Sequence, residues 1–314
     1  MRKKGFFSDK ASIFLYGLAG LLAVLLVLLV RTPRSRQPYY QPRRFPMASL
    51  QKAETTNFSS LKKKVQEYIE EQPGVFGVYF WDLTTGNHFG INEKEPLPAA
   101  SSIKVPVALY LYHQVAEKKI SLDEQMAYNP DTDWSGGAGT IRWNATPGQK
   151  FTLRELAEKL IRESDNVAWK MLYRRLGKDK IAAFMKSLGG KTVFPNGENY
   201  STAEDLALYT RAALDFANRN PDIGWILIDD MVQSIYKDGL PSYLPSDVKV
   251  GHKVGALPAV ATDVGIVFLP DRPYILSVMT KDVGASEDPG FLAIGEISRL
   301  VYTDRSGKTQ TVKQ

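Results

Sequence analysis

A run of twenty residues, 11–30, carries no charged side chain. As a helix that rises about 1.5 Å per residue, it would span roughly 30 Å, the thickness of the hydrocarbon core of a bilayer. Four basic residues precede it, and five follow within a Pro/Arg-rich stretch, 31–46, so it has no apolar neighbours to bury it in a soluble domain. No small-residue cleavage site follows Val30. We predict an uncleaved, single-pass transmembrane helix, whose orientation the flanking charges leave open.

The positive charge of the chain is concentrated in the same N-terminal part. The formal net charge is +6. Residues 1–46 hold nine basic residues and one acid, a balance of +8, which leaves −2 for the rest of the chain. A domain so close to neutral lacks the basic footprint of a nucleic-acid-binding protein, and we expect no nucleic-acid partner.

The chain contains no cysteine and only three histidines. A disulfide framework, a thiolate nucleophile and a thiolate zinc site are therefore excluded. His88, His113 and His252 follow no metal-ligand spacing, so we expect neither a metal site nor a cofactor. The glycine-rich residues 136–139 continue as neither a dinucleotide fingerprint nor a phosphate-binding loop, and they fit better as a mobile loop at the rim of a cleft.

Helix and strand patterns indicate the class of fold. Strand patterns lie near both ends of the folded part, at 75–83, 88–92, 248–254, 262–268 and 274–280. Helix patterns occur at 61–69, 102–118, 152–163, 166–176, 179–188, 202–218 and 289–302, and Ser201 with Glu204 has the form of a capping box. We predict an α+β fold, in which both chain ends form one antiparallel sheet with helices packed on it and the middle forms an all-helical lobe. The cleft between them is the expected site.

These patterns divide the chain into five segments. They are a basic N-terminal segment (1–10), a transmembrane helix (11–30), a Pro/Arg-rich linker (31–58), a folded domain (59–303) and a polar tail (304–314).

The sequence from Ser101 to Lys104 has the form S-x-x-K. The pattern alone is weak, because it also begins at Ser49, Ser59, Ser60, Ser234 and Ser246. The match at Ser101 differs because it opens an apolar helix, on which residues i and i+3 share a face. Burial lowers the pKa of a lysine, so Lys104 could accept a proton from Ser101. The alternative is a helix cap at Ser101 and a lysine that reaches solvent.

Two further short motifs follow in the chain. Ser164-Asp165-Asn166 lies at a helix-to-helix junction, where capping is the alternative role. Lys253-Val254-Gly255 lies in a late strand, where an ordinary edge lysine is the alternative. Each motif is modest by itself, but their order and settings together make chance a poor explanation.

With these three motifs, the chain resembles the class A serine β-lactamases and the penicillin-recognising DD-peptidases, whose signature is S-x-x-K, S-D-N and K-S/T-G. The resemblance covers about residues 60–302 and implies the fold of that superfamily.

The resemblance also implies roles for individual residues. Ser101 corresponds to the acylated nucleophile, Lys104 to its proton acceptor and Ser164 to the hydroxyl that passes the proton to the leaving nitrogen. The substrate-binding positions correspond to Asn166, Lys253, Val254 and Gly255. The backbone N–H groups of Ser101 and Ala256 correspond to the oxyanion hole, whose donors stabilise the charge that develops during acyl transfer.

Two departures from the family pattern affect the expected activity. Val254 replaces the Ser or Thr whose hydroxyl binds the substrate carboxylate, and losing a hydrogen bond to a charged group typically costs about 1.5–3 kcal/mol. The chain also runs from Gly190 to a capped helix at Ser201 without room for the family's Glu-bearing loop. Glu198 is the only acid in this stretch and reads as a turn residue, so deacylation is expected to be slow.

We therefore expect a membrane-anchored serine hydrolase, with an extracytoplasmic domain that forms an acyl-enzyme on Ser101. Its expected partners are a β-lactam or a D-alanyl-type peptide of peptidoglycan, and the membrane. The alternative is a catalytically silent relative that binds cell-wall peptide or a partner protein through the same cleft. The sequence does not indicate an oligomeric state.

Overall fold

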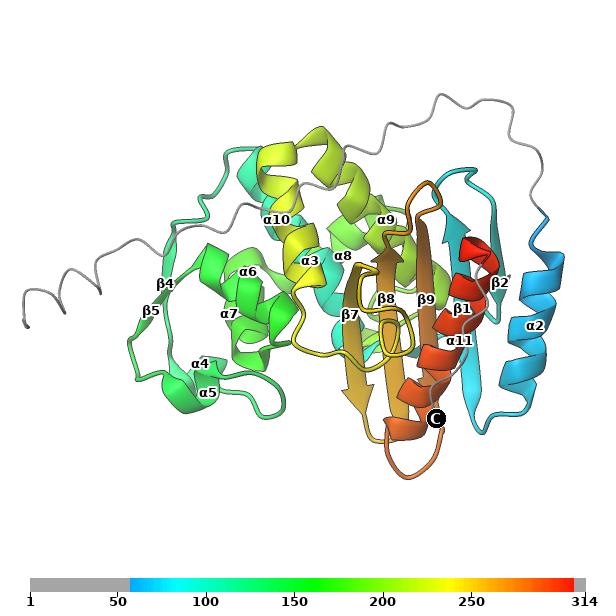
Figure 1. Cartoon of the computed structure of the whole chain (residues 1–314). Helices are drawn as coiled ribbons and strands as arrows, with labels where there is room; N and C mark the ends of the chain where they lie inside the picture. The colour runs from blue at the N-terminus through cyan, green and yellow to red at the C-terminus, as the bar shows by residue number, and fades with distance from the viewer. Residues whose placement is uncertain (1–56, 308–314) are drawn as a thin grey trace, which may run out of the picture. The chain divides into compact units, whose positions relative to one another are not determined.

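Five antiparallel strands from both ends of the folded part form the central sheet. The computed structural model describes residues 57–307 (Figure 1). The strands are β1 (Val75–Asp82), β2 (His88–Ile91), β7 (Val250–Leu257), β8 (Val260–Val267) and β9 (Tyr274–Lys281). Their order is β2-β1-β9-β8-β7, and β1 pairs with β9 along its whole length. The predicted sheet, with its pairing of early and late segments, is confirmed.

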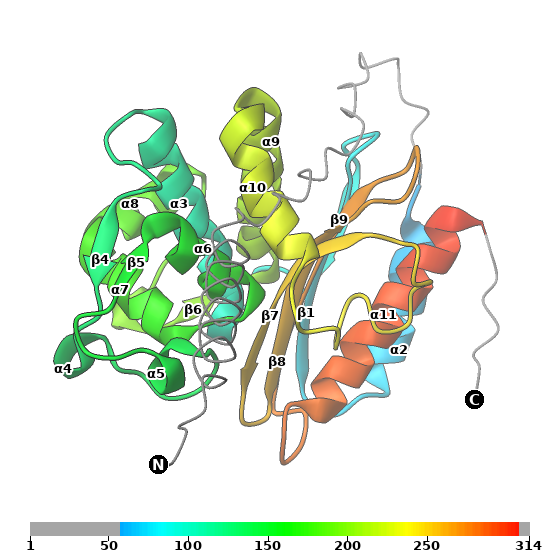
Figure 2. The same cartoon turned by 60° about the vertical axis from the view of Figure 1, so that its left-hand side comes forward.

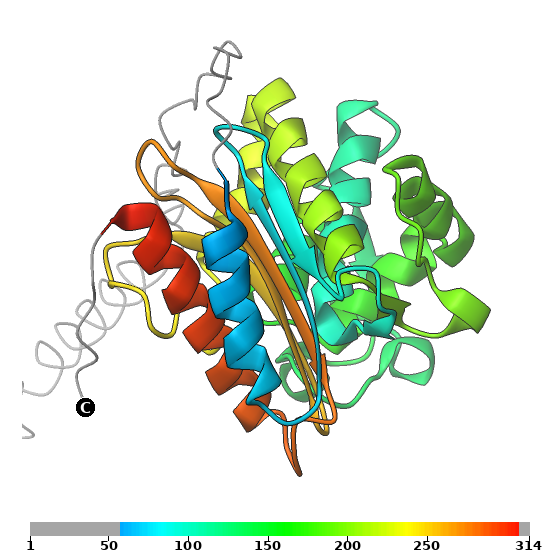
Figure 3. The ribbon, with the colours of Figure 1, turned by 90° about the vertical axis from the view of Figure 1, so that its right-hand side faces the viewer.

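The sheet lies between two layers of helices. Helices α2 (Ser59–Glu70) and α11 (Asp288–Ser306) cover one face (Figure 3), while α9 (Ala203–Arg219) and α10 (Pro221–Val232) lie on the other (Figure 2). The two cores follow from the alternation of side chains along each strand. In β1, Phe76, Val78 and Phe80 face α2 and α11. Their neighbour Tyr79 packs in the core on the opposite face.

The middle of the chain forms the predicted helical lobe. Its larger helices are α3 (Lys104–Ala116), α6 (Leu153–Arg162), α7 (Asn166–Leu176) and α8 (Lys178–Ser187). Short helices, turns and strands connect them: β3 (Leu97–Pro98), η1 (Ala100–Ile103), β4 (Gln125–Ala127), α4 (Pro130–Asp133), α5 (Ile141–Asn144), β5 (Lys150–Thr152), η2 (Pro195–Gly197) and β6 (Tyr200–Ser201). Of the first eight residues of α3, all except Tyr110 are buried, because this helix runs through the centre of the lobe.

Two details of the helices differ from the predictions. Thr202, rather than Ser201, is the N-cap of α9, and its hydroxyl accepts a hydrogen bond from the Asp205 N–H. Helix α10 was not predicted, because Pro221 and Gly224 read as breaks in the pattern. Pro is tolerated in a first helical turn. At Gly224, a Cβ atom would lie 2.4 Å from the Cα of Ala217, so glycine lets α10 pack closely on α9.

The folded domain extends slightly beyond both predicted ends. Phe58 is buried, with its ring 4.9 Å from that of Phe80. At the other end α11 continues past residue 303, and the Arg305 guanidinium contacts the Asp82 carboxylate at 2.8 Å in the interior. The predicted domain, 59–303, is therefore slightly too short at both ends, and the first residues of the predicted tail, 304–306, belong to α11. The predicted span at 11–30 lies outside the described residues, which themselves contain no helix long and apolar enough to cross a membrane.

Candidate active site

Lys104 is the first residue of α3, and its side chain enters the interior beside the helical lobe. Only 3% of its surface is exposed. Its Nζ atom lies 2.7 Å from the Ser164 carbonyl oxygen, 2.7 Å from Asn166 Oδ1 and 3.2 Å from Ser164 Oγ. The face of Trp169 lies 6.0 Å away. Two of the three predicted motifs therefore meet at this amine, and Lys104 does not reach solvent.

The Ser164-Asp165-Asn166 motif combines capping with a place in the site. One Asp165 oxygen accepts the N–H groups of Val167 and Ala168 and so caps α7. Its other oxygen accepts those of Thr140 and Ile141, and so ties down the loop before α5. The predicted capping role is thus confirmed for Asp165, while Ser164 and Asn166 contact Lys104.

Ser164 adopts a left-handed backbone conformation, with φ at +54°. Such a conformation is unusual for a residue other than glycine and persists only where the surroundings hold it. The hydrogen bond from Lys104 to the Ser164 carbonyl is one such restraint. The result is a hydroxyl that points at the lysine rather than at the backbone of the next helix.

Lys253 approaches the same hydroxyl from the sheet. It lies in β7, the strand at the edge of the sheet, and is fully buried. Its Nζ donates to Ser164 Oγ at 3.0 Å and to the carbonyl of Val254 at 2.7 Å. An ordinary edge lysine would extend into solvent, so this alternative is wrong. The Ser164 hydroxyl lies between the two lysines and links the helical lobe to the sheet.

The two amines have unusual ionisation properties. Burial lowers the pKa of Lys104 well below its ordinary value, and the positive charge of Lys253 lowers it further against the opposing effect of Asp165. Burial likewise lowers the pKa of Lys253, to about 7, although Asp263 partly offsets the shift. A lysine that is neutral near physiological pH can accept a proton.

Ser101 lies on the turn η1, immediately before α3. Ala100, which precedes it, has φ at +46°, a second strained position in the site. The side chain of Ser101 is partly exposed, and its hydroxyl makes no hydrogen bond within the described chain. The structure thus brings Lys104, Ser164 and Lys253 together by hydrogen bonds, whereas among residues 57–307 it shows no hydrogen bond between the Ser101 hydroxyl and Lys104.

The turn η1 packs directly on β7. At Gly255, a Cβ atom would lie 2.6 Å from the backbone nitrogen of Ser101 and 2.6 Å from Thr262 Oγ1. The Ser102 hydroxyl contacts the Lys253 carbonyl and Thr262 Oγ1, at 3.1 and 2.6 Å. Ala256 follows Gly255 on the exposed end of the strand. The Ser101 N–H predicted for the oxyanion hole therefore lies against the strand that carries the second predicted donor.

Several contributing residues were missed by sequence reasoning. Ser102 and Thr262 join η1 to the sheet, as described above. Asn199 donates from Nδ2 to the carbonyl of Ala100 at 2.8 Å, so the segment before α9 also holds the turn. A hydroxyl or an amide far along the chain carries no local signal for such contacts.

The glycine-rich loop at 136–139 is tied to the site and is not a free rim. The Asn166 amide donates to the Gly136 carbonyl at 2.8 Å, and the Asn166 N–H donates to Ala138. A Cβ atom at Gly137 would lie 2.6 Å from Asn166 Nδ2, and Gly137 has φ at +85°. These contacts place residues 136–139 directly at the site, and the mobility of the loop stays a prediction.

The segment before α9 agrees with the interpretation of Glu198 as a turn residue. Glu198 ends the turn η2, and its side chain is exposed. Its N–H donates to the Pro195 carbonyl and its own carbonyl accepts from Tyr200.

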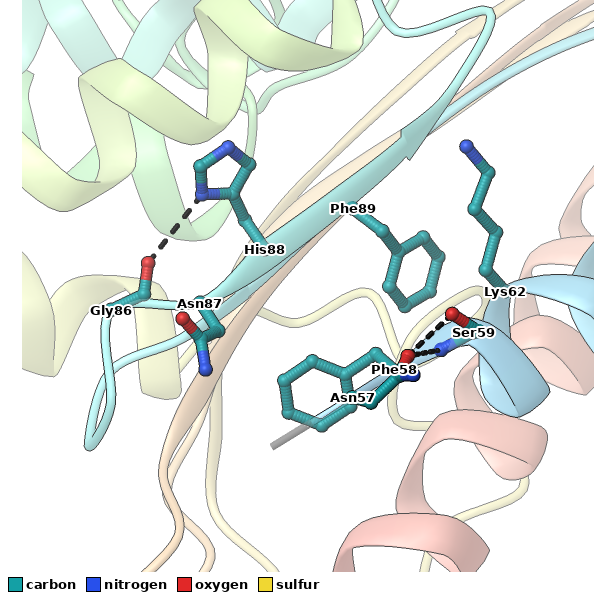
Figure 4. A pocket seen from close by; sticks show the side chains of 8 residues that line it. All are labelled: Asn57, Phe58, Ser59, Lys62, Gly86, Asn87, His88 and Phe89. Atoms are coloured by element: carbon teal, nitrogen blue, oxygen red, sulfur yellow. Dashed lines mark hydrogen bonds between the residues drawn. The ribbon is translucent and has the colours of Figure 1, made fainter. Parts of the chain in front are cut away.

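A separate pocket of about 500 Å³ lies beside the start of α2 (Figure 4). It is lined by Asn57, Phe58, Ser59, Lys62, Gly86, Asn87, His88 and Phe89. None of the residues predicted for the site lines it. Within residues 57–307, no cluster of three or more His, Asp or Glu side chains is arranged to hold a metal ion.

Gly255→Ala is expected to lower both stability and activity. The new methyl group would press on the backbone of η1 and on a buried hydroxyl, and overpacking of this kind typically costs about 1–3 kcal/mol. Displacement of the turn by about 1 Å would slow a reaction at Ser101, the predicted nucleophile, roughly 100-fold. Thermal unfolding and acylation rates test both. Gly136→Ala is the control for stability, because its Cβ would meet no atom closer than 3.8 Å. Unchanged behaviour of Gly255→Ala would contradict the close packing.

Comparisons with known proteins agree with this arrangement. Residues 60–304 match the model of the beta-lactamase enzyme family. The chain is 25% identical over 281 residues to the extended-spectrum beta-lactamase PER-1 of Pseudomonas aeruginosa, which covers 82% of this chain and 91% of that protein. It is 23% identical over 266 residues to beta-lactamase SME-1 of Serratia marcescens, which covers 76% and 86%.

Solved structures give the same result. The structure of PBP-A is 28% identical, with a TM-score of 0.74, and covers 80% of this chain and 97% of that one. A mutant of PBP-A, solved as an acyl-enzyme complex with penicillin G, is 27% identical with a TM-score of 0.74, and covers 79% and 97%.

Proposed function

The chain belongs to the beta-lactamase enzyme family, whose members are serine hydrolases, and on this premise we propose that it forms an acyl-enzyme on Ser101. The acyl donor is a β-lactam or a D-alanyl-type peptide of peptidoglycan. One observation carries the proposal: the Ser164 hydroxyl lies within 3.2 Å of two buried lysine amines, beside the turn that presents Ser101.

The neighbours of Lys104 Nζ fit a neutral amine. The Ser164 carbonyl and Asn166 Oδ1 can only accept hydrogen bonds, so they take the two N–H groups of the amine. The third neighbour, Ser164 Oγ, is a hydroxyl and can donate to the remaining lone pair. Lys253 in turn donates to Ser164 Oγ. A proton can therefore move between Lys104 and Ser164 without rearrangement of the side chains.

The proposed reaction uses this chain of groups in order. Ser101 Oγ attacks the carbonyl carbon while its proton passes to the lone pair of neutral Lys104, which the Ser164 hydroxyl releases by turning toward the leaving nitrogen. The backbone N–H groups of Ser101 and Ala256 stabilise the resulting oxyanion. As the C–N bond breaks, Ser164 donates its proton to the leaving nitrogen and regains one from Lys104. The ester on Ser101 remains and Lys104 is neutral again.

Slow deacylation is part of the proposal. Glu198 is the only acid between Gly190 and Ser201, and its exposed carboxylate is hydrated by bulk solvent. Such a group cannot position a single water molecule against the ester. A mutant of PBP-A, to which this chain is similar, has been solved as an acyl-enzyme complex with penicillin G.

Time-resolved mass spectrometry with benzylpenicillin tests the proposal. The protein is expected to gain the mass of one intact penicillin and to lose it much more slowly than it was gained. Rapid turnover without an accumulating adduct would contradict slow deacylation. Absence of an adduct with every β-lactam and D-Ala-D-Ala peptide tried would contradict acyl transfer, and ligand binding without an adduct would favour the silent, peptide-binding alternative.

We also propose that residues 11–30 anchor the enzyme in a membrane, with the domain outside the cytoplasm where peptidoglycan lies. The support is the uncharged twenty-residue run and the class of substrate. After cell fractionation the full chain is expected in the membrane fraction, accessible to protease from outside. A chain that begins at residue 31 should be released, and membrane retention of that shorter chain would contradict the anchor.

A further inference from the structure

Tyr236 contacts both lobes at the candidate active site. It lies in the segment between α10 and β7, drawn in yellow in Figure 1, and its side chain is half-buried. Its hydroxyl donates to the carbonyl of Glu163 at 3.2 Å, on the helical lobe. Its own carbonyl accepts from His252 Nε2 at 3.1 Å, on β7. The preceding N–H, of Ile235, donates to the Arg162 carbonyl.

On the sheet side, the ring of Tyr236 lies against Lys253. The Nζ atom is 5.9 Å from the ring centroid, within the range of a cation–π contact. The two hydrogen bonds of this amine go to Ser164 Oγ and the Val254 carbonyl. The ring therefore completes the surroundings of the ammonium group, which is removed from water, and favours its charged form.

On the helical side, Tyr236 holds the residue before Ser164. A left-handed Ser164 needs its neighbours to be restrained on both sides. Asp165 is restrained by its capping hydrogen bonds and by its own N–H, which donates to the Lys159 carbonyl. The Glu163 N–H donates to the Lys159 carbonyl, and its carboxylate contacts Lys159 Nζ at 3.0 Å. The Glu163 carbonyl, which is next to Ser164, is held by the Tyr236 hydroxyl.

We propose that Tyr236 is a positioning residue of this site, which fixes the Ser164 hydroxyl against the Lys253 ammonium by holding Glu163 with its hydroxyl and Lys253 with its ring. It needs no contact with the substrate. The kinetic consequence rests on the proposed acyl transfer, whereas the effect on Lys253 can be measured in the resting protein.

The charges around Lys253 determine the sign of the expected pH effect. Asp263, on β8, stabilises the ammonium, and Lys104, on α3, is of the same charge when protonated. Both ring nitrogens of His252 are hydrogen-bonded, Nδ1 to the Asp263 carboxylate and Nε2 to the Tyr236 carbonyl. The phenol stays uncharged, because burial and the carboxylates of Glu163 and Asp165 raise its pKa. Loss of the ring therefore lowers the pKa of Lys253 from about 7, so that less of it is charged at neutral pH.

Two substitutions separate the two contacts. Tyr236→Phe loses the hydroxyl and keeps the ring, so acylation by benzylpenicillin is expected to slow about 3- to 10-fold, with the pKa of Lys253 unchanged. Tyr236→Leu loses both, so acylation should slow about 10- to 100-fold and the pKa of Lys253 should fall by about 0.5 unit. The backbone contact with His252 remains in both. Tyr243→Phe, at an exposed tyrosine of the same segment, is the control.

Lysine-selective NMR titration of Lys253, stopped-flow acylation and thermal unfolding are the measurements. A lower pKa only in Tyr236→Leu, with stepwise slowing from Phe to Leu, supports the proposal. A fall in melting temperature with neither change would overturn it and leave a structural role. If the parent protein is never acylated, acyl transfer fails by itself, and the NMR titration still decides between the two roles of Tyr236.

Discussion

Replacing Ser101 by alanine is expected to abolish acylation, with a fall in rate of about four to six orders of magnitude. Its hydroxyl oxygen would form the ester of the proposed acyl-enzyme. Because the side chain is partly exposed on η1, the substitution should leave the fold intact. Mass spectrometry after incubation with benzylpenicillin measures the effect.

The matched control for this substitution is Ser60→Ala. Ser60 also starts an S-x-x-K pattern, with Lys63, but it is exposed on α2 on the far face of the sheet. The Ser60→Ala protein should be labelled by benzylpenicillin at the same rate as the parent protein. A Ser101→Ala protein that still forms the penicillin adduct would place the nucleophile elsewhere and remove the basis of the proposed function.

Lys104→Met is expected to slow acylation by about two to four orders of magnitude, the usual contribution of a positioned general base. Met retains the length of the side chain but cannot take the Ser101 proton. Because the pKa of Lys104 is lowered by burial and by Lys253, the parent rate should rise with pH through that lowered value and level off well below the ordinary lysine range. The rise follows the neutral fraction of Lys104 and should be absent in Lys104→Met.

Acylation rates between pH 5 and 9 test this dependence. Lys119→Met, at an exposed lysine just beyond α3, should keep the parent profile. An unchanged ascending limb in Lys104→Met would show that another group accepts the proton. A parent rate that keeps rising to the ordinary lysine range would contradict the lowered pKa.

The architecture could largely be predicted because it depends on local pattern. Phe76, Val78 and Phe80 identify one covered face of a strand, and the apolar Tyr79 between them indicates that the other face is covered too. The order of strands and helices limits the topology. The element bounds were less certain. Helix α10 was missed because glycine usually interrupts a helix pattern. The reason for a glycine at 224, which is its close packing against Ala217 of α9, is visible only in the structure.

The candidate site divides in the same way. The sequence suggested Ser101, Lys104, Ser164, Asn166 and Lys253 through three motifs, and four of them meet at hydrogen-bond distance. It did not suggest Thr262, Asn199 or Tyr236. Each of these contacts the site from a distant segment whose composition is ordinary.

By itself, then, the amino-acid sequence determined the class of fold, the three motifs, and the small net charge of −2 that remains outside the basic residues 1–46. Those properties are sums over neighbouring residues, which periodicity and spacing record. Only the tertiary structure decided that Ser164 stands between two buried amines, that Gly255 admits the turn of Ser101, and that Tyr236 contacts both lobes. Burial and hydrogen bonding depend on which faces meet across 60 to 160 residues of chain, and no local pattern contains that information.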